Sequence, residues 1–284
     1  MKKSVFTIAL LFSLLYSITS EAQNQTVTLR VPNFVRPLVE KWVAEYRKTN
    51  ENIDFQFVSG KSQDNKNTIA FTASQNEGVS FARFAILPVT TRQSEAEKII
   101  SSHKLNTRRL RNLFFLDEEL EEEEELSKAE RKIHVYVASN QLSASKPFAE
   151  YLGEPAAAFK GKKIYGDDSF LNNAISRDPL GITVNSLSNI FDLENRTIHE
   201  ELALLPLDID KQGKQILSQG NLDDIISLLE QRHYSEIPVV KAGLAFDQQN
   251  PVLADFVRWV LLNGTQYVHQ FGLLQLQQNE LVSK

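Results

Sequence analysis

The sequence contains no cysteine in 284 residues. This absence excludes disulfide bonds, metal sites built on thiolates, and a lipid anchor on an N-terminal cysteine. Beyond the N-terminal segment there is also no apolar run of the roughly 20 residues that a membrane-spanning helix needs. Folding and function must therefore come from noncovalent packing, backbone groups and ordinary polar side chains.

Motifs for catalysis are also missing. There is no Gly-x-Ser-x-Gly, and no pair of histidines has the spacing of a helical metal site. The adjacent carboxylates Asp167-Asp168 and Asp223-Asp224 point apart along one element, and Asp223-Asp224 suits the first turn of a helix. The sequence therefore favours a binding protein over an enzyme, with no cofactor and no metal. The scattered histidines are His103, His134, His199, His233 and His269.

The first residues have the features of a secretory signal peptide. Lys2 and Lys3 precede a short apolar core, and Ser20 and Ala22 form a small-residue cleavage site. We expect cleavage before Gln23, so that residues 1–22 are removed and 23–284 form the mature protein. An exported chain of this size without disulfides is typical of a bacterial envelope, and we expect it in the periplasm.

The formal net charge is −5, and removing two lysines and one glutamate with residues 1–22 makes it −6. A general nucleic-acid binder needs a basic face, so we expect no nucleic-acid partner. We also expect a monomer.

The mature chain begins with a parallel strand–helix–strand unit. Residues 26–31 alternate like a strand, and in the next segment Phe34, Leu38, Trp42 and Tyr46 recur every four residues, as on one face of a helix. Residues 53–58 form the second strand, and this order indicates an α/β protein.

Later segments continue the α/β pattern. Residues 132–139 and 237–246 read as strands, Asn221 as a helix cap, and 251–276 as a helix that opens with proline. The acidic run 117–125 follows a basic cluster of Arg108, Arg109 and Arg111. We interpret this run as a solvated segment rather than a cation site, because neighbouring carboxylates spread around a helix.

The segment "FQFVSGKSQ" contains Gly60-Lys61-Ser62 after a strand. A nucleotide-binding P-loop needs a glycine five positions before Gly60, and that position is Phe55, so the P-loop is excluded. Two interpretations stay open. The segment is either a turn whose N–H groups, hydroxyl and ammonium meet an anion, or a plain turn.

Taken in order, several segments resemble the phosphate-type periplasmic substrate-binding proteins of ABC transporters. They are "VPNFVRPLVEKWVAEYRKTN", "FQFVSGKSQ", "FAILPVTTRQSEAE", "DPLGITVNSLSNIFD" and "ADFVRWVLLNGTQYVHQFGLLQL". The likeness covers most of residues 26–276. The segments "LRNLFFLDEE", "FKGKKIYGDDSFLNNAI" and "LALLPLDIDKQG" are similar to a compact branch of that family in Bacteroidetes-type bacteria.

The sequence also departs from the family pattern. The hydroxyl-rich turn before the first helix reads Val31 to Phe34, and Lys61 is inserted in the second turn. The family's phosphate-binding aspartate has no counterpart beside Ile86. Its Ser-Gly-Thr motif is replaced by residues 166–170. The fold is therefore a firmer expectation than the ligand.

The resemblance implies a type II periplasmic-binding-protein fold with two α/β lobes. We expect lobe 1 at about 26–131 plus the C-terminal segment, and lobe 2 at about 132–240. It further implies capture of phosphate or a similar oxyanion for an ABC transporter permease. The implied ligand-binding residues are Asn33, Phe34, Ser59, Gly60, Lys61, Ser62, Thr90, Thr91, Arg92 and Ser169.

A second interpretation keeps the fold without the ligand. The lost hydroxyls favour a module with a degenerate cleft, which acts as an envelope sensor or a protein-interaction scaffold. The acidic run and the arginine cluster would then form its partner surface.

Overall fold

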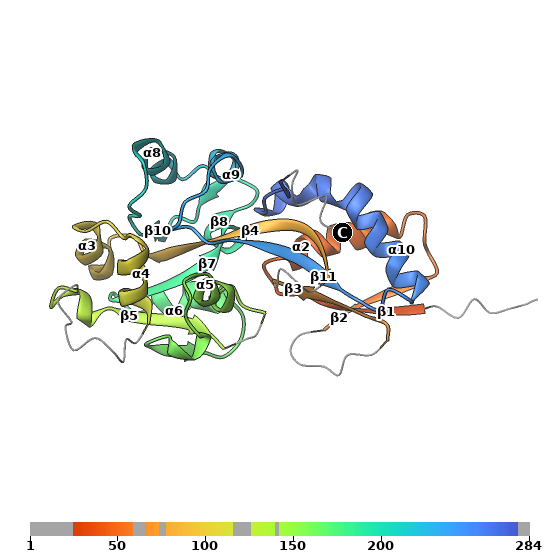
Figure 1. The fold of residues 1–284 in the computed structure, drawn as a ribbon, viewed down its shortest axis with the longest axis horizontal. Helices are drawn as coiled ribbons and strands as arrows, with labels where there is room; N and C mark the ends of the chain where they lie inside the picture. Colours follow the sequence, from red (N-terminus) through yellow and green to blue (C-terminus); the bar gives the residue numbers. More distant parts are fainter. Residues whose placement is uncertain (1–24, 59–65, 74–77, 116–125, 140–141, 278–284) are drawn as a thin grey trace, which may run out of the picture.

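The computed structural model describes residues 25–58, 66–73, 78–115, 126–139 and 142–277. The predicted signal peptide, the residues Ser59 to Ser62 and the acidic run 117–125 lie outside the described residues. Figure 1 shows a molecule with two parts along its long axis, joined by two long strands. No helix of the described part is long and apolar enough to cross a membrane.

A mixed sheet extends through both parts of the molecule. Its order is β2-β1-β3-β11-β4-β7-β5-β6, and β10 pairs with β4. The pairs among β1, β2 and β3 are parallel, as are those among β5, β6 and β7, whereas β4 and β11 run antiparallel to their neighbours. The strands are β1 (Gln25–Arg30), β2 (Ile53–Phe57), β3 (Thr68–Thr72), β4 (Val79–Thr91), β5 (His134–Ala138), β6 (Lys162–Ile164), β7 (Gly181–Ser186), β10 (Leu202–Leu204) and β11 (Val239–Ala245).

Helices cover the sheet, and a small ribbon of β8 (Phe191–Asp192) and β9 (Thr197–Ile198) lies apart from it. The α-helices are α2 (Arg36–Tyr46), α3 (Glu95–Ser101), α4 (Thr107–Phe114), α5 (Ser145–Tyr151), α6 (Ser169–Ile175), α7 (Leu187–Ile190), α8 (Lys211–Gln219), α9 (Leu222–Gln231) and α10 (Pro251–Trp259). After α10 the chain continues as a π-helical segment, η3 (Val260–Gly264), and a 3-10 segment, η4 (Thr265–Phe271).

The first helix confirms the expected pattern. Pro37 lies in the first turn of α2, where its missing N–H removes no helical hydrogen bond. Leu38, Trp42 and Tyr46 are all buried, as their spacing of four residues predicts. Tyr46 packs edge-on against Phe256 of α10 with ring centroids 5.1 Å apart. The two helices therefore cover the same face of the sheet.

Strand β4 carries the chain from one part of the molecule to the other. Its residues up to Ala85 pair with β11, whereas Ile86 to Thr90 pair with β7. We therefore use lobe 1 for residues 25–85 and 239–277, and lobe 2 for 86–238. The limits expected from the sequence placed residues 86–131 in lobe 1, with the boundary near residue 132. Figure 1 shows α3 and α4 beside β5 and β10 instead.

The arginine cluster on α4 serves the packing of lobe 2. Arg109 forms an ion pair with Glu130, whose side chain is only 1% exposed, and Arg111 pairs with Glu154. The bonds from Arg109 and from Ser127 outweigh the burial of Glu130 and lower the pKa of its carboxyl. These two arginines are therefore tied into intramolecular contacts.

Candidate functional site

The topology brings the carboxyl ends of the two parallel strand sets toward the same region. Thr72, at the end of β3, lies opposite Gly243, and β3 runs toward the start of β11, which pairs with Ala85. In lobe 2, Ser186 at the end of β7 lies opposite Ile86. Both sets thus point at the crossover between Ala85 and Ile86. In open α/β sheets, ligands bind beyond the carboxyl ends of the strands, so this is the candidate site.

Lobe 1 contributes the turn between β1 and α2. Pro32 O accepts hydrogen bonds from Val35 N (3.1 Å) and Arg36 N (3.0 Å), which folds the turn. Within the described part of the chain, the backbone N–H groups of Asn33 and Phe34 donate to no acceptor. The Phe34 ring is buried against Phe71 and Phe84. Phe34 therefore anchors the turn through its side chain and leaves its N–H for an anion at the positive end of α2.

Arg36, a cation that the sequence interpretation missed, lies beside this turn. The guanidinium of Arg36 lies 4.8 Å from the ring centroid of Phe57, the last residue of β2, and pairs with Glu40 at 2.8 Å. It is held at the carboxyl end of β2, which lies beside β1. Its position at the start of α2 was the available signal, since a basic residue opposes the helix dipole there.

Lobe 2 contributes a buried carboxylate whose hydrogen bonds come from the same lobe. Asp168 is 2% exposed and accepts hydrogen bonds from Ser143 Oγ and from Ala144 N (2.8 Å). Burial raises the pKa of its carboxyl to about 6. Asn185 Nδ2 donates to the Asp168 carbonyl oxygen at 2.9 Å, so β7 helps to hold the segment. The sequence interpretation noted only that Asp167 and Asp168 point apart, because the partners of Asp168 are distant along the chain.

The predicted residue Ser169 lies at the same edge of lobe 2. It is exposed at the start of α6, and its backbone N–H donates to Asp167 Oδ1 at 3.0 Å. Its amide is therefore already engaged. Asn33, Phe34 and Ser169 are the described members of the predicted set that lie beyond carboxyl ends of strands.

The structure places Thr90, Thr91 and Arg92 elsewhere. Thr90 pairs with Ile182 at the start of β7, at the opposite end of that strand from the crossover. Its hydroxyl donates to Gly181 O (2.8 Å) and contacts Ser94 Oγ (3.2 Å), and Arg92 Nη2 donates to Leu202 O (3.2 Å). These three residues therefore do not join Asn33 and Phe34. Thr90 and Arg92 support the end of β4.

The described residues contain no group of three or more His, Asp or Glu side chains that could hold a metal ion. The site that they form is instead one of backbone N–H groups, hydroxyls and a cation. Such groups replace the water shell of an anion without any bond being made or broken.

Comparisons with known proteins address the fold. No protein-family model matches the chain, and no curated protein matches its sequence. Among solved structures, one described as a phosphate ABC transporter substrate-binding protein with bound phosphate, from Clostridium perfringens, is similar with a TM-score of 0.60. It is 12% identical, and the match covers 89% of this chain and 100% of that chain.

Two further solved structures are also similar to the chain in fold. A phosphate transport receptor of the ABC type from Vibrio cholerae has a TM-score of 0.55 at 9% identity, over 88% of this chain and 100% of that one. A structure described as a phosphate-binding protein, from Planctomyces limnophilus, has a TM-score of 0.51 at 10% identity, over 90% and 95%. At these identities the likeness establishes the fold. The chain has the two-lobed α/β fold of periplasmic binding proteins, as the sequence predicted.

Proposed function

We propose that this chain is an exported solute-binding protein that captures phosphate or a related oxyanion in the periplasm for an ABC transporter. One observation carries the proposal. The carboxyl ends of both parallel strand sets face the crossover, and there the N–H groups of Asn33 and Phe34 stand without acceptors within the described residues. The solved structures with this fold include one with bound phosphate, which supports the same ligand class.

The arrangement is suited to binding rather than to catalysis. Phosphate carries negative charge on several oxygens, and backbone N–H groups at the start of α2 with a guanidinium nearby are complementary to it. Lys61 and the hydroxyls of Ser59 and Ser62 follow β2 in sequence and would extend the donor set. Closure of the two lobes about β4 and β11 would then signal occupancy to a permease.

A calorimetric titration tests the ligand, with Lys61→Ala as the informative variant. A charge-assisted hydrogen bond contributes roughly 1.5–3 kcal/mol, so losing the Lys61 ammonium should weaken phosphate binding about ten- to a hundredfold. Arg92→Ala is the matched control, because it also removes a cation but lies at the far end of β4. Equal losses in both variants would count against this site.

One observation favours a second function, a module with a degenerate cleft that acts as an envelope sensor or scaffold. In lobe 2, the donors nearest the crossover are engaged by the chain itself. Ser143 Oγ and Ala144 N bond Asp168, and Ser169 N bonds Asp167. If calorimetric titration of the wild-type protein detects no binding of phosphate or sulfate at millimolar concentration, this second function is favoured.

A further inference from the structure

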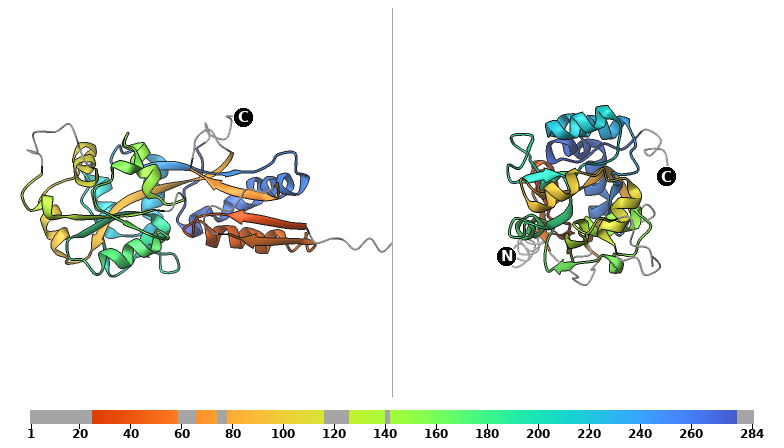
Figure 2. Two further views of the ribbon diagram at one scale, coloured as in Figure 1. Left: turned by 90° about the horizontal axis from the view of Figure 1, so that it is seen from below. Right: turned by 90° about the vertical axis from the view of Figure 1, so that its left-hand side faces the viewer.

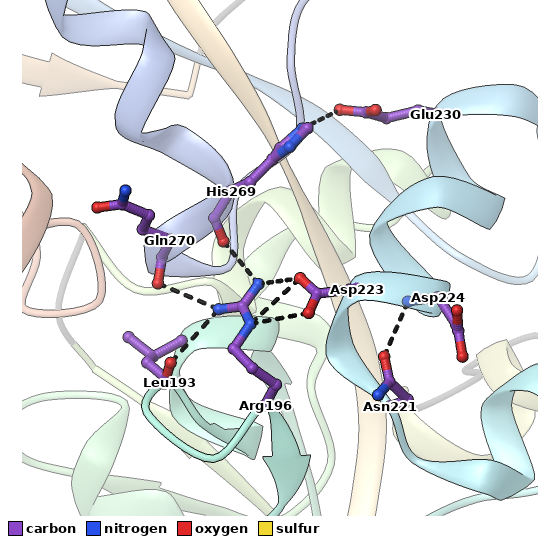
Figure 3. Close-up of polar contacts among 8 residues, drawn as sticks. All are labelled: Leu193, Arg196, Asn221, Asp223, Asp224, Glu230, His269 and Gln270. Atoms are coloured by element: carbon purple, nitrogen blue, oxygen red, sulfur yellow. Dashed lines mark hydrogen bonds and ion pairs between the residues drawn. The ribbon is translucent and has the colours of Figure 1, made fainter.

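A single arginine connects three parts of the chain on one side of the crossover. Arg196 lies in the turn between β8 and β9, and its guanidinium donates to His269 O (2.9 Å) and Gln270 O (3.2 Å). The same group contacts both carboxylate oxygens of Asp223 in α9, with Nε at 3.2 and 3.3 Å. Figure 3 shows the guanidinium between the end of η4 and the start of α9.

These contacts join the two lobes. Arg196 and Asp223 belong to lobe 2, whereas η4 belongs to the segment that packs on lobe 1. Trp42 Nε1 of α2 donates to Gly264 O (2.8 Å) just before η4, and Leu274 just after it pairs with Arg83 of β4. The Arg196 bonds are therefore an interlobe connection that is separate from the strands β4 and β11.

A second pair of contacts reinforces the first. Glu230, near the end of α9, accepts a hydrogen bond from Gln275 N (2.6 Å) and lies 2.8 Å from His269 Nε2. Helix α9 thus contacts the lobe 1 segment directly near its C-terminal end, as Figure 3 shows for Glu230 and His269, and through Arg196 near its N-terminal end. We call the set Arg196, Asp223, Glu230, His269, Gln270 and Gln275 the rear clasp.

The rear clasp lies on the opposite side of the crossover strands from α5 and α6, which form the lobe 2 edge of the candidate site. In Figure 1, α9 and the terminal helical segment lie above β4 and β11, whereas α5 and α6 lie below them. The end-on view in Figure 2 agrees. The Asp168 segment, at the start of α6, is therefore on the side away from the clasp.

The backbone conformation of Arg196 is unfavourable for a residue with a side chain, which indicates a role for the guanidinium. Its φ is 60°, in the left-handed region that residues with a Cβ rarely adopt. The turn is held by Asp192 O, which accepts from Arg196 N at 2.8 Å. Glycine would adopt this conformation without steric cost. An arginine here is consistent with a role for the guanidinium that offsets the unfavourable backbone.

We propose that Arg196 is a positioning residue. Its bonds hold the lobes apart on the side that carries α6, and in this way Arg196 sets the ligand affinity. This inference rests on the proposed function for its effect on affinity. When the lobes rotate about β4 and β11 to close the side that carries α6, their opposite sides separate. The bonds from Arg196 to His269 O and Gln270 O must then stretch or break, so the clasp favours the open form.

The lack of cysteine makes a direct test simple. Cysteines introduced at the exposed positions Gln56 in β2 and Lys146 in α5 can carry spin labels, one in each lobe. We expect Arg196→Ala and Arg196→Gly to shift the distance distribution between the labels to shorter values and to broaden it. Arg196→Gly removes the guanidinium bonds of the clasp while relieving the backbone, so it stays informative if Arg196→Ala folds poorly.

The matched control is Arg232→Ala. Arg232 also pairs with an aspartate, Asp210 at 2.8 Å, and bonds Gln212, but all three residues lie in lobe 2. Its label distances should equal those of the parent. If Arg196→Gly leaves the distance distribution unchanged, the inference is overturned, whatever the result with phosphate.

Affinity provides the second measurement. Because the apparent dissociation constant scales inversely with the fraction of competent protein, Arg196→Gly should bind phosphate about three- to tenfold more tightly. Unchanged or weaker binding in a protein that binds phosphate would overturn the proposed direction. Absence of phosphate binding in the parent counts against the proposed function alone, since the label distances still test the clasp.

Discussion

Trp42 links the position of the candidate site to the stability of lobe 1. Its side chain is fully buried, its ring meets Phe81 edge-on at 4.9 Å, and its indole N–H donates to Gly264 O at 2.8 Å. The bond connects α2, which presents the turn of Asn33 and Phe34, to the terminal segment of the chain. We expect Trp42→Phe to loosen both the packing of α2 and the attachment of the terminal segment.

The cost of this substitution has two parts. Phenylalanine has no donor, so Gly264 O loses its indole partner inside the protein, which costs about 1–3 kcal/mol. The smaller ring also leaves a void, worth about 1–2 kcal/mol by comparison with larger truncations. Together they give a loss of about 2–5 kcal/mol, or a fall in melting temperature of about 4–20 °C for a protein of this size.

Urea and thermal unfolding monitored by circular dichroism measure this loss. The matched control is Trp259→Phe, the other tryptophan of the chain. Trp259 is half-buried and meets Tyr46 edge-on at 5.7 Å, and among the described residues its indole N–H has no acceptor. If Trp42→Phe is no more destabilising than Trp259→Phe, the stated role of the Gly264 bond is refuted.

Three further predictions follow from the same structure. Arg36→Ala should weaken phosphate binding several-fold in calorimetry with little change in melting temperature, and an unchanged affinity would remove this cation from the site. Asp168 keeps its proton up to about pH 6 in the folded state, above its usual pKa of 3.8. Stability toward urea should therefore fall as pH rises from about 4 to 6, and Asp168→Asn should flatten that dependence. Envelope-purified protein should begin at Gln23, and a sequence that begins before Ser17 would contradict the signal peptide.

The sequence predicted what local patterns determine. The period of four residues in α2, Pro37 in its first turn and the Asn221 cap of α9 are all confirmed. Each depends on contacts within a few residues or on the alternation of buried and exposed positions, which a sequence displays directly. The parallel pairing of β1 and β2 follows from the helix between them.

The site residues on β4 were misplaced because strand direction is a long-range property. The segment "FAILPVTTR" resembles a segment of the family, and this resemblance put Thr90, Thr91 and Arg92 in the predicted site. In the structure it is the second half of a long strand that runs away from the crossover. Alternation gives the faces of a strand but not its direction, which is set by partners such as β7, about 95 residues later in sequence.

The rear clasp and the Asp168 contacts could not be predicted from the sequence, because they join residues that are far apart along the chain. Asp223 was explained by the helix dipole, and that explanation holds, since it lies in the first turn of α9. Its pKa is lowered first of all by the hydrogen bond from Arg196, a residue 27 positions away. No local pattern connects Arg196 to His269, which is 73 positions further on.

The central claim is that an oxyanion binds at the turn between β1 and α2, beyond the carboxyl ends of the strands. The most direct test follows the backbone amide signals of isotopically labelled protein during titration with phosphate, at fixed ionic strength. The signals of Asn33 and Phe34 should move progressively and saturate, while those of Thr90 and Arg92 stay in place. If phosphate at millimolar concentration leaves Asn33 and Phe34 unmoved, the claim is contradicted.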